Sequence, residues 1–576
     1  MSGNPTEDHS SRNPIMRAIL SHYSRNTYHR SEKQIEREKY LLGLFPFNRW
    51  LLFPAAVLLQ FCCGSLYAWS VFNKPIDNAL YGDPNKGMAP ITFYIAVGCF
   101  GLSAAIMGPW LERNGPMKAS FIGSSLFIIG NCLTALAIHT KQLWLIYVGY
   151  GVIGGFGLGL TYISPVSALQ KWFPDFRGMA AGFAVCGFGA GSIAFAQIPG
   201  PLIRDLGLPV TFTILAAIYL VVMFSCALIV RIPPPGYSIK GMTSDREKLT
   251  STQPQDETVV EAKGSPSSLA SDSKGNSSNR DVEAIASEGT MVPPGQASGN
   301  SHISSMDPSV IRLTLIESLT SREYLIMYFM FFANSIFGLV VISRLSNMVQ
   351  DLFGRDASTA ATIVSINGGL NLAGRLIFAT ISDRIGRKSI FCFFLTAQSI
   401  ILIILPTLLN TRNYGGFLAC MFILTACYGG GFGIIPAFLS DMFGSKNIGA
   451  CHGVVLTAWA IAGVAGGLCF TGIYNNIRAG GALASDPRAY NVNLYWILAL
   501  VLCGFIIVWF LRVSTHDRLV PPVEGEVFRY RVFGRLIRYV RGQGLRRVSR
   551  AQEQLEWEQF VSQARTSPQV QEKPLV

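Results

Sequence analysis

The chain contains twelve stretches of about twenty predominantly apolar residues, and this feature constrains its fold more than any other. A helix of about twenty such residues spans the hydrocarbon core of a bilayer, which is about 30 Å thick. Only 14% of the 576 residues are charged, against about 25% in a soluble domain. We therefore predict an all-α integral membrane protein with twelve transmembrane helices, at about 49–72, 90–110, 118–138, 143–166, 176–198, 209–231, 323–349, 357–381, 388–409, 414–438, 447–471 and 491–512.

Polar segments divide this pattern into two halves. Residues 232–322 are rich in Ser, Pro, Gly and charged residues, a composition that cannot bury a core. We expect this segment to be a disordered cytoplasmic linker between two six-helix bundles at 49–231 and 323–512. The remaining segments, 1–48 and 513–576, are expected to be cytoplasmic tails.

The net charge of +13 is concentrated toward the two ends of the chain. Between Arg529 and Arg550 there are eight arginines and no acidic residue. Basic tails beside membrane spans are typical of the cytoplasmic side, where they face anionic lipid. We expect the 529–550 stretch to be either a surface-lying amphipathic helix or a disordered basic tail. The protein is expected to be a monomer in the plasma membrane, without a nucleic-acid partner.

Two motifs occur once in each half of the chain at matching places. The first joins the fourth and fifth spans, with Pro, Gly and Gly at 165, 178 and 182, and recurs at 436, 449 and 453. The second joins the second and third spans as Glu112, Arg113 and Gly115. It recurs in the second half as Asp383, Arg384 and Gly386. Two halves in the same orientation indicate a parallel repeat.

The second copy of the loop, Asp383 to Lys388, resembles the signature loop of the major facilitator superfamily. The first copy departs from that signature, with Glu112 for the aspartate and Pro116 for a basic residue. A carboxylate at a helix end can pair with an arginine and with a neighbouring helix N-terminus. The alternative is a tight turn with solvated charges. On the resemblance, the residues expected to close a cytoplasmic gate are Glu112, Arg113, Asp383, Arg384 and Arg387.

Arg375 is the strongest candidate for a binding residue. It lies eight residues before Asp383, roughly 12 Å along the helix and near the bilayer middle. Asn367, Asn371 and Arg375 share one helix face. No Asp or Glu lies well inside any span, so the expected counter-ion is a substrate carboxylate, which fits the fork of a guanidinium. The alternative is that Arg375 pairs with backbone carbonyls at a helix break.

Two other basic residues lie within the predicted spans. Arg344 is near the outer end of the seventh span, and we expect it to extend to the membrane surface. His452 is expected to be a packed neutral histidine, although a minor coupling role stays open. The aromatic residues expected to shape the pocket around Arg375 and Asn371 are Tyr67, Trp69, Tyr428 and Trp459.

The segment from Leu66 to Phe72 and the Gly374-Arg375 pair look like the oxalate/formate antiporter family, whose wider membership resembles monocarboxylate transporters. The resemblance implies exchange of small carboxylates. That family's oxalate exchanger pairs its arginine with a lysine in the eleventh span, where this chain has Trp459. One cation instead of two favours a single carboxylate. Monocarboxylate transporters place an aspartate before the arginine, where this chain has Gly374.

These observations predict a transporter of small monocarboxylates such as lactate, pyruvate or formate, working by alternating access. Two alternatives stay open: a transport-like nutrient receptor that signals through its linker and tail, and a carrier of another organic anion such as oxalate. An enzyme is not expected, because the sequence has no hydrolase, metalloprotease or Cys/His metal motif. No metal or cofactor is expected.

Overall fold

The computed structural model describes residues 14–24, 30–41, 45–84, 86–234, 237, 314–445, 447–483, 485–513, 517–518, 520–532 and 535–566. Most of the predicted linker at 232–322 lies outside the described residues. The predicted tails are described only in part. The following paragraphs therefore concern the two helical halves, the short elements before the first span and the elements after the last one.

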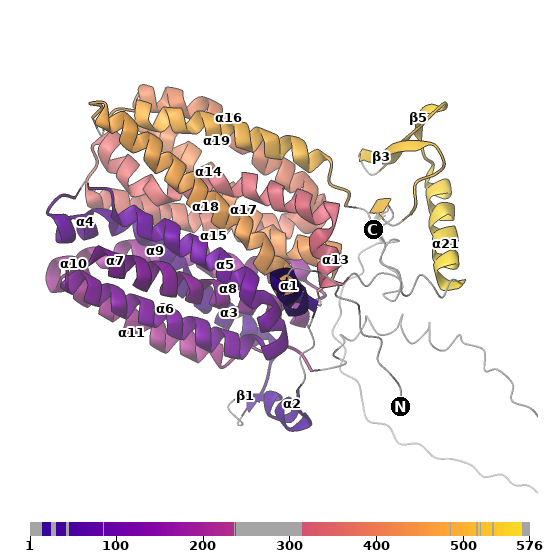
Figure 1. Cartoon of the computed structure of the whole chain (residues 1–576), viewed down its shortest axis with the longest axis horizontal. Helices are drawn as coiled ribbons and strands as arrows, with labels where there is room; N and C mark the ends of the chain where they lie inside the picture. The colour runs from indigo at the N-terminus through magenta and orange to yellow at the C-terminus, as the bar shows by residue number, and fades with distance from the viewer. Residues whose placement is uncertain are drawn as a thin grey trace, which may run out of the picture. The chain divides into compact units, whose positions relative to one another are not determined.

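The first half contains six membrane-spanning helical segments (Figure 1). The first, fourth and fifth are not single α-helices, since they contain 3-10, π-helical or separate α-helical stretches. Their elements are η1 Arg49–Leu51, α3 Leu52–Cys63, η2 Gly64–Val71, α5 Ala89–Asn114, α6 Pro116–His139, α7 Leu143–Ile146, η3 Tyr147–Gly154, α8 Gly155–Trp172, α9 Arg177–Gln197, α10 Pro199–Leu206 and α11 Leu208–Ala227. The short helix α4, Asn73–Tyr81, follows the first span.

The second half repeats this order with longer, less interrupted helices. They are α13 Leu315–Thr320, α14 Arg322–Phe353, α15 Ala357–Ile385, α16 Arg387–Asn410, α17 Tyr414–Phe443, α18 Ile448–Ala479 and α19 Arg488–Trp509. In the described part of the chain, eleven helical segments are long and apolar enough to cross a membrane. The predicted eighth span, 357–381, is present as α15, but its polar residues, which include Asn367, Asn371 and Arg375, keep it outside that set.

The repeated loop has the same backbone in both halves. Helix α5 ends at Gly115 with φ 85°, and α15 ends at Gly386 with φ 97°. Residues with a side chain rarely adopt a positive φ, so glycine permits the tight turn into the next helix. The matching turns agree with the parallel repeat inferred from the sequence.

The two bundles meet through two long helix pairs, α5 with α18 and α9 with α15. Figure 1 shows the first bundle, in indigo to magenta, beside the second, in pink to orange. Glycines allow the backbones to approach closely. A Cβ atom at Gly453 of α18 would lie 2.1 Å from the carbonyl oxygen of Ala104 in α5. The interface between the bundles is therefore tightly packed.

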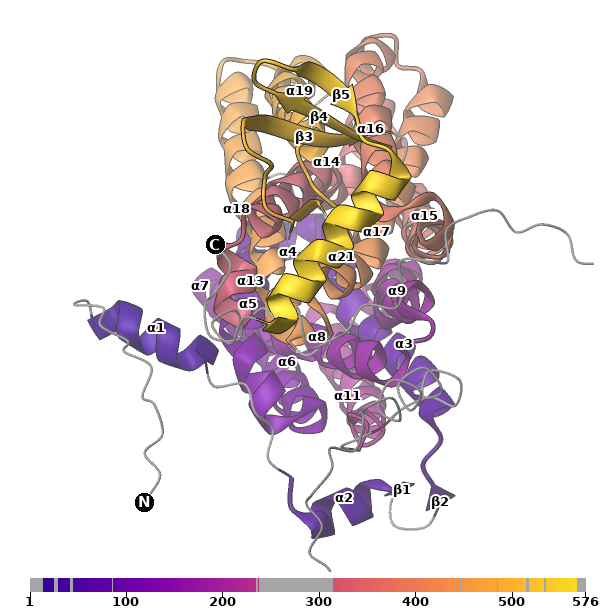
Figure 2. The same ribbon diagram turned by 90° about the vertical axis from the view of Figure 1, so that its right-hand side faces the viewer.

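The basic stretch at 529–550 is neither an amphipathic helix nor a disordered tail, so both predictions for it are wrong. It forms an antiparallel sheet in the order β3–β4–β5, followed by a helix (Figure 2). Along β4, Leu536 and Arg538 are buried while Arg535 and Tyr539 are exposed. This alternation has the period of a strand. The elements are β3 Glu526–Val532, β4 Arg535–Val540, β5 Gly544–Arg547 and α21 Arg550–Thr566.

Acidic residues outside the basic stretch stabilise this small unit. Arg538 pairs with Glu556 of α21 at 2.8 Å and with Glu526 of β3 at 3.0 Å. The sheet therefore neutralises arginines that the sequence taken alone presents as an unpaired basic run. The described elements before the first span are α1 Pro14–Ser24, α2 Glu32–Glu38, and the pair β1 Tyr40–Leu41 and β2 Phe45–Pro46.

Candidate functional site

Arg375 lies at the contact between the two bundles and is completely buried, with 0% of its surface exposed. Its Nε donates a hydrogen bond to Asn371 Oδ1 at 2.7 Å, and Nη1 donates to the carbonyl oxygen of Val185 in α9 at 3.0 Å. Nη2 is buried and has no hydrogen-bond partner among the described residues. The guanidinium also lies over the rings of Phe432, at 4.8 Å, and Phe188, at 5.5 Å. No described carboxylate pairs with it.

Two phenols connect the bundles beside this arginine. The hydroxyl groups of Tyr67, in η2, and Tyr428, in α17, are 2.6 Å apart. The indole Nε1 of Trp459, in α18, donates a hydrogen bond to the Tyr428 hydroxyl at 2.8 Å. Arg375 interacts electrostatically with Tyr67. The structure thus brings together four predicted site residues from four different elements.

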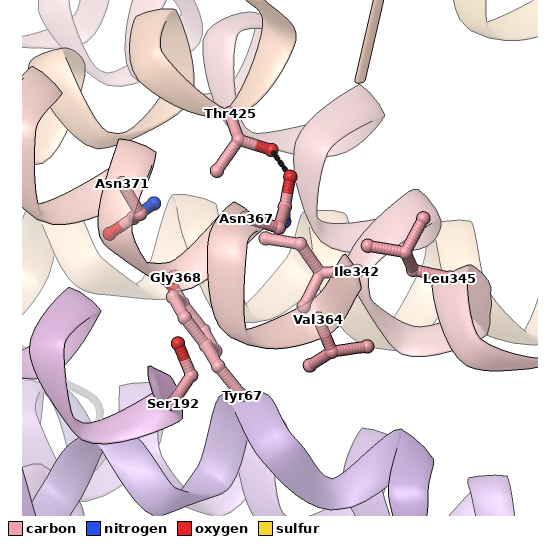
Figure 3. Close-up of a pocket in the computed structure, with 9 residues that line it drawn as sticks. All are labelled: Tyr67, Ser192, Ile342, Leu345, Val364, Asn367, Gly368, Asn371 and Thr425. Carbon is pink, nitrogen blue, oxygen red and sulfur yellow. Dashed lines mark hydrogen bonds between the residues drawn. The ribbon is translucent and has the colours of Figure 1, made fainter. Parts of the chain in front are cut away.

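A small cavity lies next to this cluster (Figure 3). It holds about 10 Å³ of free space, which is about the room that one water molecule needs. Asn371 joins the cavity to Arg375, and the Thr425 hydroxyl donates to Asn367 Oδ1 at 2.6 Å. The residues that line it are Tyr67, Ser192, Ile342, Leu345, Val364, Asn367, Gly368, Asn371 and Thr425.

Trp69 is the predicted pocket residue that lies elsewhere. Its Nε1 donates to the carbonyl oxygen of Ala89 at 3.1 Å, and its ring packs on Tyr150 at 4.3 Å. Both contacts are inside the first bundle. Tyr67 and Trp69 belong to a 3-10 helix, and side chains two residues apart point in different directions in a 3-10 helix and in an α-helix alike, so the two could not both face Arg375. The sequence did not reveal this local change of helix type.

Three aromatic residues beside Arg375 were missed by the sequence analysis: Phe188, Phe432 and Tyr162. In the sequence they are marked only by lying within Gly-rich helices, and this does not distinguish a binding-site residue from an ordinary packed one. His452 lies in the same region, 5.8 Å from the Tyr162 ring. Both of its ring nitrogens are buried, and neither has a hydrogen-bond partner among the described residues. His452 is therefore a packed side chain in this state, as its sequence position suggested.

We use "terminal end" for the end of the bundles at which residues 49, 234, 314 and 513 lie, and "far end" for the opposite one. Glu112 closes one half of the terminal end and is only 6% exposed. Its Oε1 accepts hydrogen bonds from the Gly449 N–H, at 2.9 Å, and from the Ser167 hydroxyl, at 3.1 Å. Its Oε2 pairs with Lys171. A carboxylate of the first bundle thus binds the N-terminus of α18 in the second.

Asp383 occupies the matching place in the other half of the terminal end. A Cβ atom at Gly178, near the N-terminus of α9, would lie 2.2 Å from Asp383 Oδ2. Arg387 pairs with Asp383 at 2.8 Å and with Asp441 at 2.5 Å. Asp441 also pairs across the bundles with Arg177 at 3.4 Å. The repeated motifs therefore meet each other across the interface.

The other two predicted gate residues have different surroundings. Arg384 is exposed. Arg113 contacts helix α1, where its Nη1 donates to the His22 carbonyl oxygen at 2.8 Å and Nη2 lies 3.0 Å from His22 Nδ1. Of the five residues, Glu112, Asp383 and Arg387 thus lie in the network between the bundles.

Helix α1 contacts α5 at a turn where a proline interrupts the helical hydrogen bonds. Pro109 has no N–H and leaves the carbonyl oxygen of Ala105, four residues earlier, without its helical partner. The Tyr23 hydroxyl donates to this oxygen at 2.8 Å, and His22 Nε2 lies 2.7 Å from the Ile106 carbonyl oxygen. Burial raises the pKa of Tyr23 to about 12, so its phenol keeps the proton that it donates at neutral pH.

The far end is also closed by contacts between the bundles. Asn73 donates to Asn347 at 3.3 Å, and Lys74 pairs with Asp351 at 3.2 Å. One turn earlier on α14, Ser343 lies 3.4 Å from the Tyr94 hydroxyl of α5. Contacts between the bundles therefore lie at both ends of the structure, on either side of the small cavity.

Arg344 corrects another prediction. The side chain does not extend to the membrane surface, since it is only 6% exposed. Its Nη2 donates to the Thr471 hydroxyl at 2.7 Å, and the guanidinium lies 5.6 Å from the Tyr474 ring. The prediction was wrong because α14 continues for nine more residues, to Phe353, and the surrounding helices cover the arginine.

Two repeated helical bundles that close around a central cavity define a membrane transporter. The chain matches the family model of the Major Facilitator Superfamily over residues 42–467, and it belongs to that family. It is therefore a transporter rather than an enzyme.

Individual relatives are distant. The chain is 26% identical to the uncharacterized MFS-type transporter YhjX of Escherichia coli, over 72% of this chain and 86% of the relative. It is 22% identical to the oxalate:formate antiporter of Oxalobacter formigenes, over 73% of this chain and 84% of the relative. Among solved structures, an outward-facing bacterial homologue of ferroportin has a TM-score of 0.50 and 13% identity, covering 79% of this chain and 98% of that one. This last similarity concerns the fold alone.

Proposed function

We propose that this protein transports small monocarboxylates of the lactate, pyruvate or formate class, and that Arg375 binds the carboxylate. The observation that carries this proposal is the environment of Arg375. Its guanidinium is fully buried, its Nη2 has no partner in the described part of the chain, and no described acidic side chain pairs with it.

A buried charge without a counter-ion is costly, by several kcal/mol even after relaxation of the protein. Asn371, the Val185 carbonyl and two aromatic rings reduce this cost but bring no negative charge. A carboxylate can supply that charge together with two acceptor oxygens for the guanidinium. The small cavity beside Asn371 is the space that would widen to admit it.

The neutral groups around Arg375 favour one carboxylate rather than two. Tyr67, Tyr428 and Trp459 offer hydroxyl and indole groups, and none of them is cationic. They would bind the rest of a small organic anion or its second carboxylate oxygen. The name of the related antiporter includes formate, a monocarboxylate, and oxalate, a dicarboxylate, so the preference for one carboxylate rests on the neutral groups around Arg375. In our proposal Trp69 acts indirectly, by supporting the segment that presents Tyr67.

Transport would follow from alternating opening of the two closed ends. Contacts of Glu112, Asp383 and Arg387 would break when the terminal end opens, and the Lys74–Asp351 pair would break at the far end. We place the terminal end in the cytoplasm and the protein in the plasma membrane, as the basic tails and the repeated loop indicate.

The test is counterflow of labelled pyruvate into liposomes that contain the purified protein. Wild type should show saturable uptake, and Arg375→Ala should lose it while still eluting as a folded protein. Arg204→Ala is the matched control, because that side chain is 77% exposed, and its uptake should equal that of wild type. Saturable uptake by Arg375→Ala would remove Arg375 from the site. Absence of uptake in folded wild type would refute pyruvate as a substrate.

A further inference from the structure

Arg344 is a second buried cation that has no anionic partner among the described residues. Its Nε is buried without a hydrogen-bond partner among the described residues, while Nη2 binds the neutral hydroxyl of Thr471. The rings of Phe470 and Tyr474 lie 5.8 Å and 5.6 Å from the guanidinium. No described carboxylate pairs with it. The nearest acidic residue toward the far end of α14, Asp351, is already paired with Lys74.

Arg344 lies at a different depth from Arg375. It is nine residues from the far end of α14, roughly 14 Å, whereas Arg375 is eighteen residues from the far end of α15, roughly 27 Å. The two arginines are therefore separated by roughly 13 Å along the pathway, too far apart for both to hold one small carboxylate.

The contacts of Arg344 change when the far end opens. Tyr94 belongs to the first bundle, and its hydroxyl lies 3.4 Å from the Ser343 hydroxyl and 3.5 Å from the Thr471 hydroxyl. Arg344, Ser343 and Thr471 all belong to the second bundle. Separation of the bundles at the far end would carry Tyr94 away and uncover the guanidinium on the side where a solute enters.

We infer that Arg344 is a second anion-binding residue, which holds the carboxylate of a solute in the far half of the pathway before it reaches Arg375. The identity of the carboxylate rests on the proposed function, but the attraction of anions to this point does not. The competing role for Arg344 is mechanical, in which it only orders Thr471 and Tyr94 through hydrogen bonds.

A reactive thiol beside Arg344 separates these roles. Thr471→Cys places a thiol where the Thr471 hydroxyl now lies 2.7 Å from Arg344 Nη2, in a region that the opening would expose. The exposed native thiols Cys132, Cys469 and Cys503 are replaced by serine so that they do not contribute. The protein in lipid nanodiscs is then treated with anionic sulfonatoethyl methanethiosulfonate or with the cationic trimethylammonioethyl reagent, and the two reaction rates are compared.

The ratio of the anionic to the cationic rate should fall at least fivefold when Arg344→Gln is added. Glutamine removes the charge but keeps N–H donors. Arg344→Lys, which keeps the charge, should retain the ratio within twofold, and so should Tyr94→Phe, which removes only a hydroxyl. A fall of less than fivefold with Arg344→Gln, an equal fall with Arg344→Lys, or no reaction with either reagent would each overturn the inference. Pyruvate counterflow by wild type judges the proposed function separately.

Discussion

The two bundles share one plan but carry their charges differently. In the first, the carboxylate of Glu112 at the terminal end is buried and binds Lys171, Ser167 and the N-terminus of α18. In the second, the side chain of the matching Asp383 is 41% exposed and is held by Arg387. The repeat thus reproduces the backbone and the position of the carboxylate, but not its environment.

A similar asymmetry holds within the membrane-spanning helices. Arg344 and Arg375, two buried arginines that lie away from the helix ends, both belong to the second bundle. The first bundle contributes neutral groups to them: the Val185 carbonyl, the ring of Phe188, and the phenols of Tyr67 and Tyr94. The shared repeat therefore accounts for the matching contacts at the terminal end, and in our proposal the second bundle determines which charge is accepted.

The largest effect on the gate comparison is expected from Glu112→Ala. It removes a buried acceptor from Lys171 and from the Gly449 N–H. We expect the closed form of the terminal end to become about 2 kcal/mol less stable relative to the open form. This loss is smaller than that for a fully buried ion pair, because Lys171 is partly exposed. The measurement is the reaction rate of Ser440→Cys, a buried position that hydrogen-bonds across the bundles to Gln170, with a maleimide. The rate should rise about thirtyfold, and a rise below threefold would contradict the buried role of Glu112.

A smaller effect is expected from Asp383→Ala in the same assay. This carboxylate is largely solvated, and exposed ion pairs contribute about 0.5–1 kcal/mol. The rate at Ser440→Cys should rise two- to fivefold. Arg384→Ala is the matched control, since that neighbour is exposed, and should change the rate by less than twofold. A larger rise in the reaction rate with Asp383→Ala than with Glu112→Ala would contradict the expectation that Glu112 contributes more to closing the terminal end.

The smallest effect is expected from Tyr23→Phe, which removes one hydrogen bond to the Ala105 carbonyl beside Pro109. A part-buried bond of this kind contributes about 0.5 kcal/mol, so the rate should about double. Because burial raises the pKa of Tyr23 from 10.0 to about 12, its contribution is fully present below pH 10 and is lost as pH rises through 12. A difference between Tyr23→Phe and wild type that varied between pH 6 and pH 9 would contradict this assignment.

Much of the helical fold was predictable, because apolar length and repeated motifs depend on local sequence. The glycines at 115 and 386 marked matching loops in the sequence, and in the structure both have positive φ angles. The strands at 526–547 were missed for a physical reason. Their alternation was interrupted by turns at Gly542 and Gly544, and the acidic partners of the arginines lie outside the basic run.

The candidate site was predictable in its residues more than in its contacts. Arg375 could be selected because an isolated cation within a span is rare, and Tyr67, Tyr428 and Trp459 do lie together. The direction of Trp69 could have been obtained, since it lies two residues from Tyr67 and cannot share its face. The direction of Arg344 could not, because it depends on how the surrounding helices pack. The roles of all these residues in binding stay predictions.

The central claim is that Arg375 recognises the negative charge of a carboxylate. The most direct measurement compares pyruvate with pyruvamide, its uncharged amide, as inhibitors of labelled-pyruvate counterflow in proteoliposomes. Wild type should be inhibited by pyruvate at least a hundredfold more effectively, because a charge-assisted pair with a buried guanidinium contributes about 3 kcal/mol. Equal inhibition of wild type by pyruvamide and pyruvate would contradict the claim.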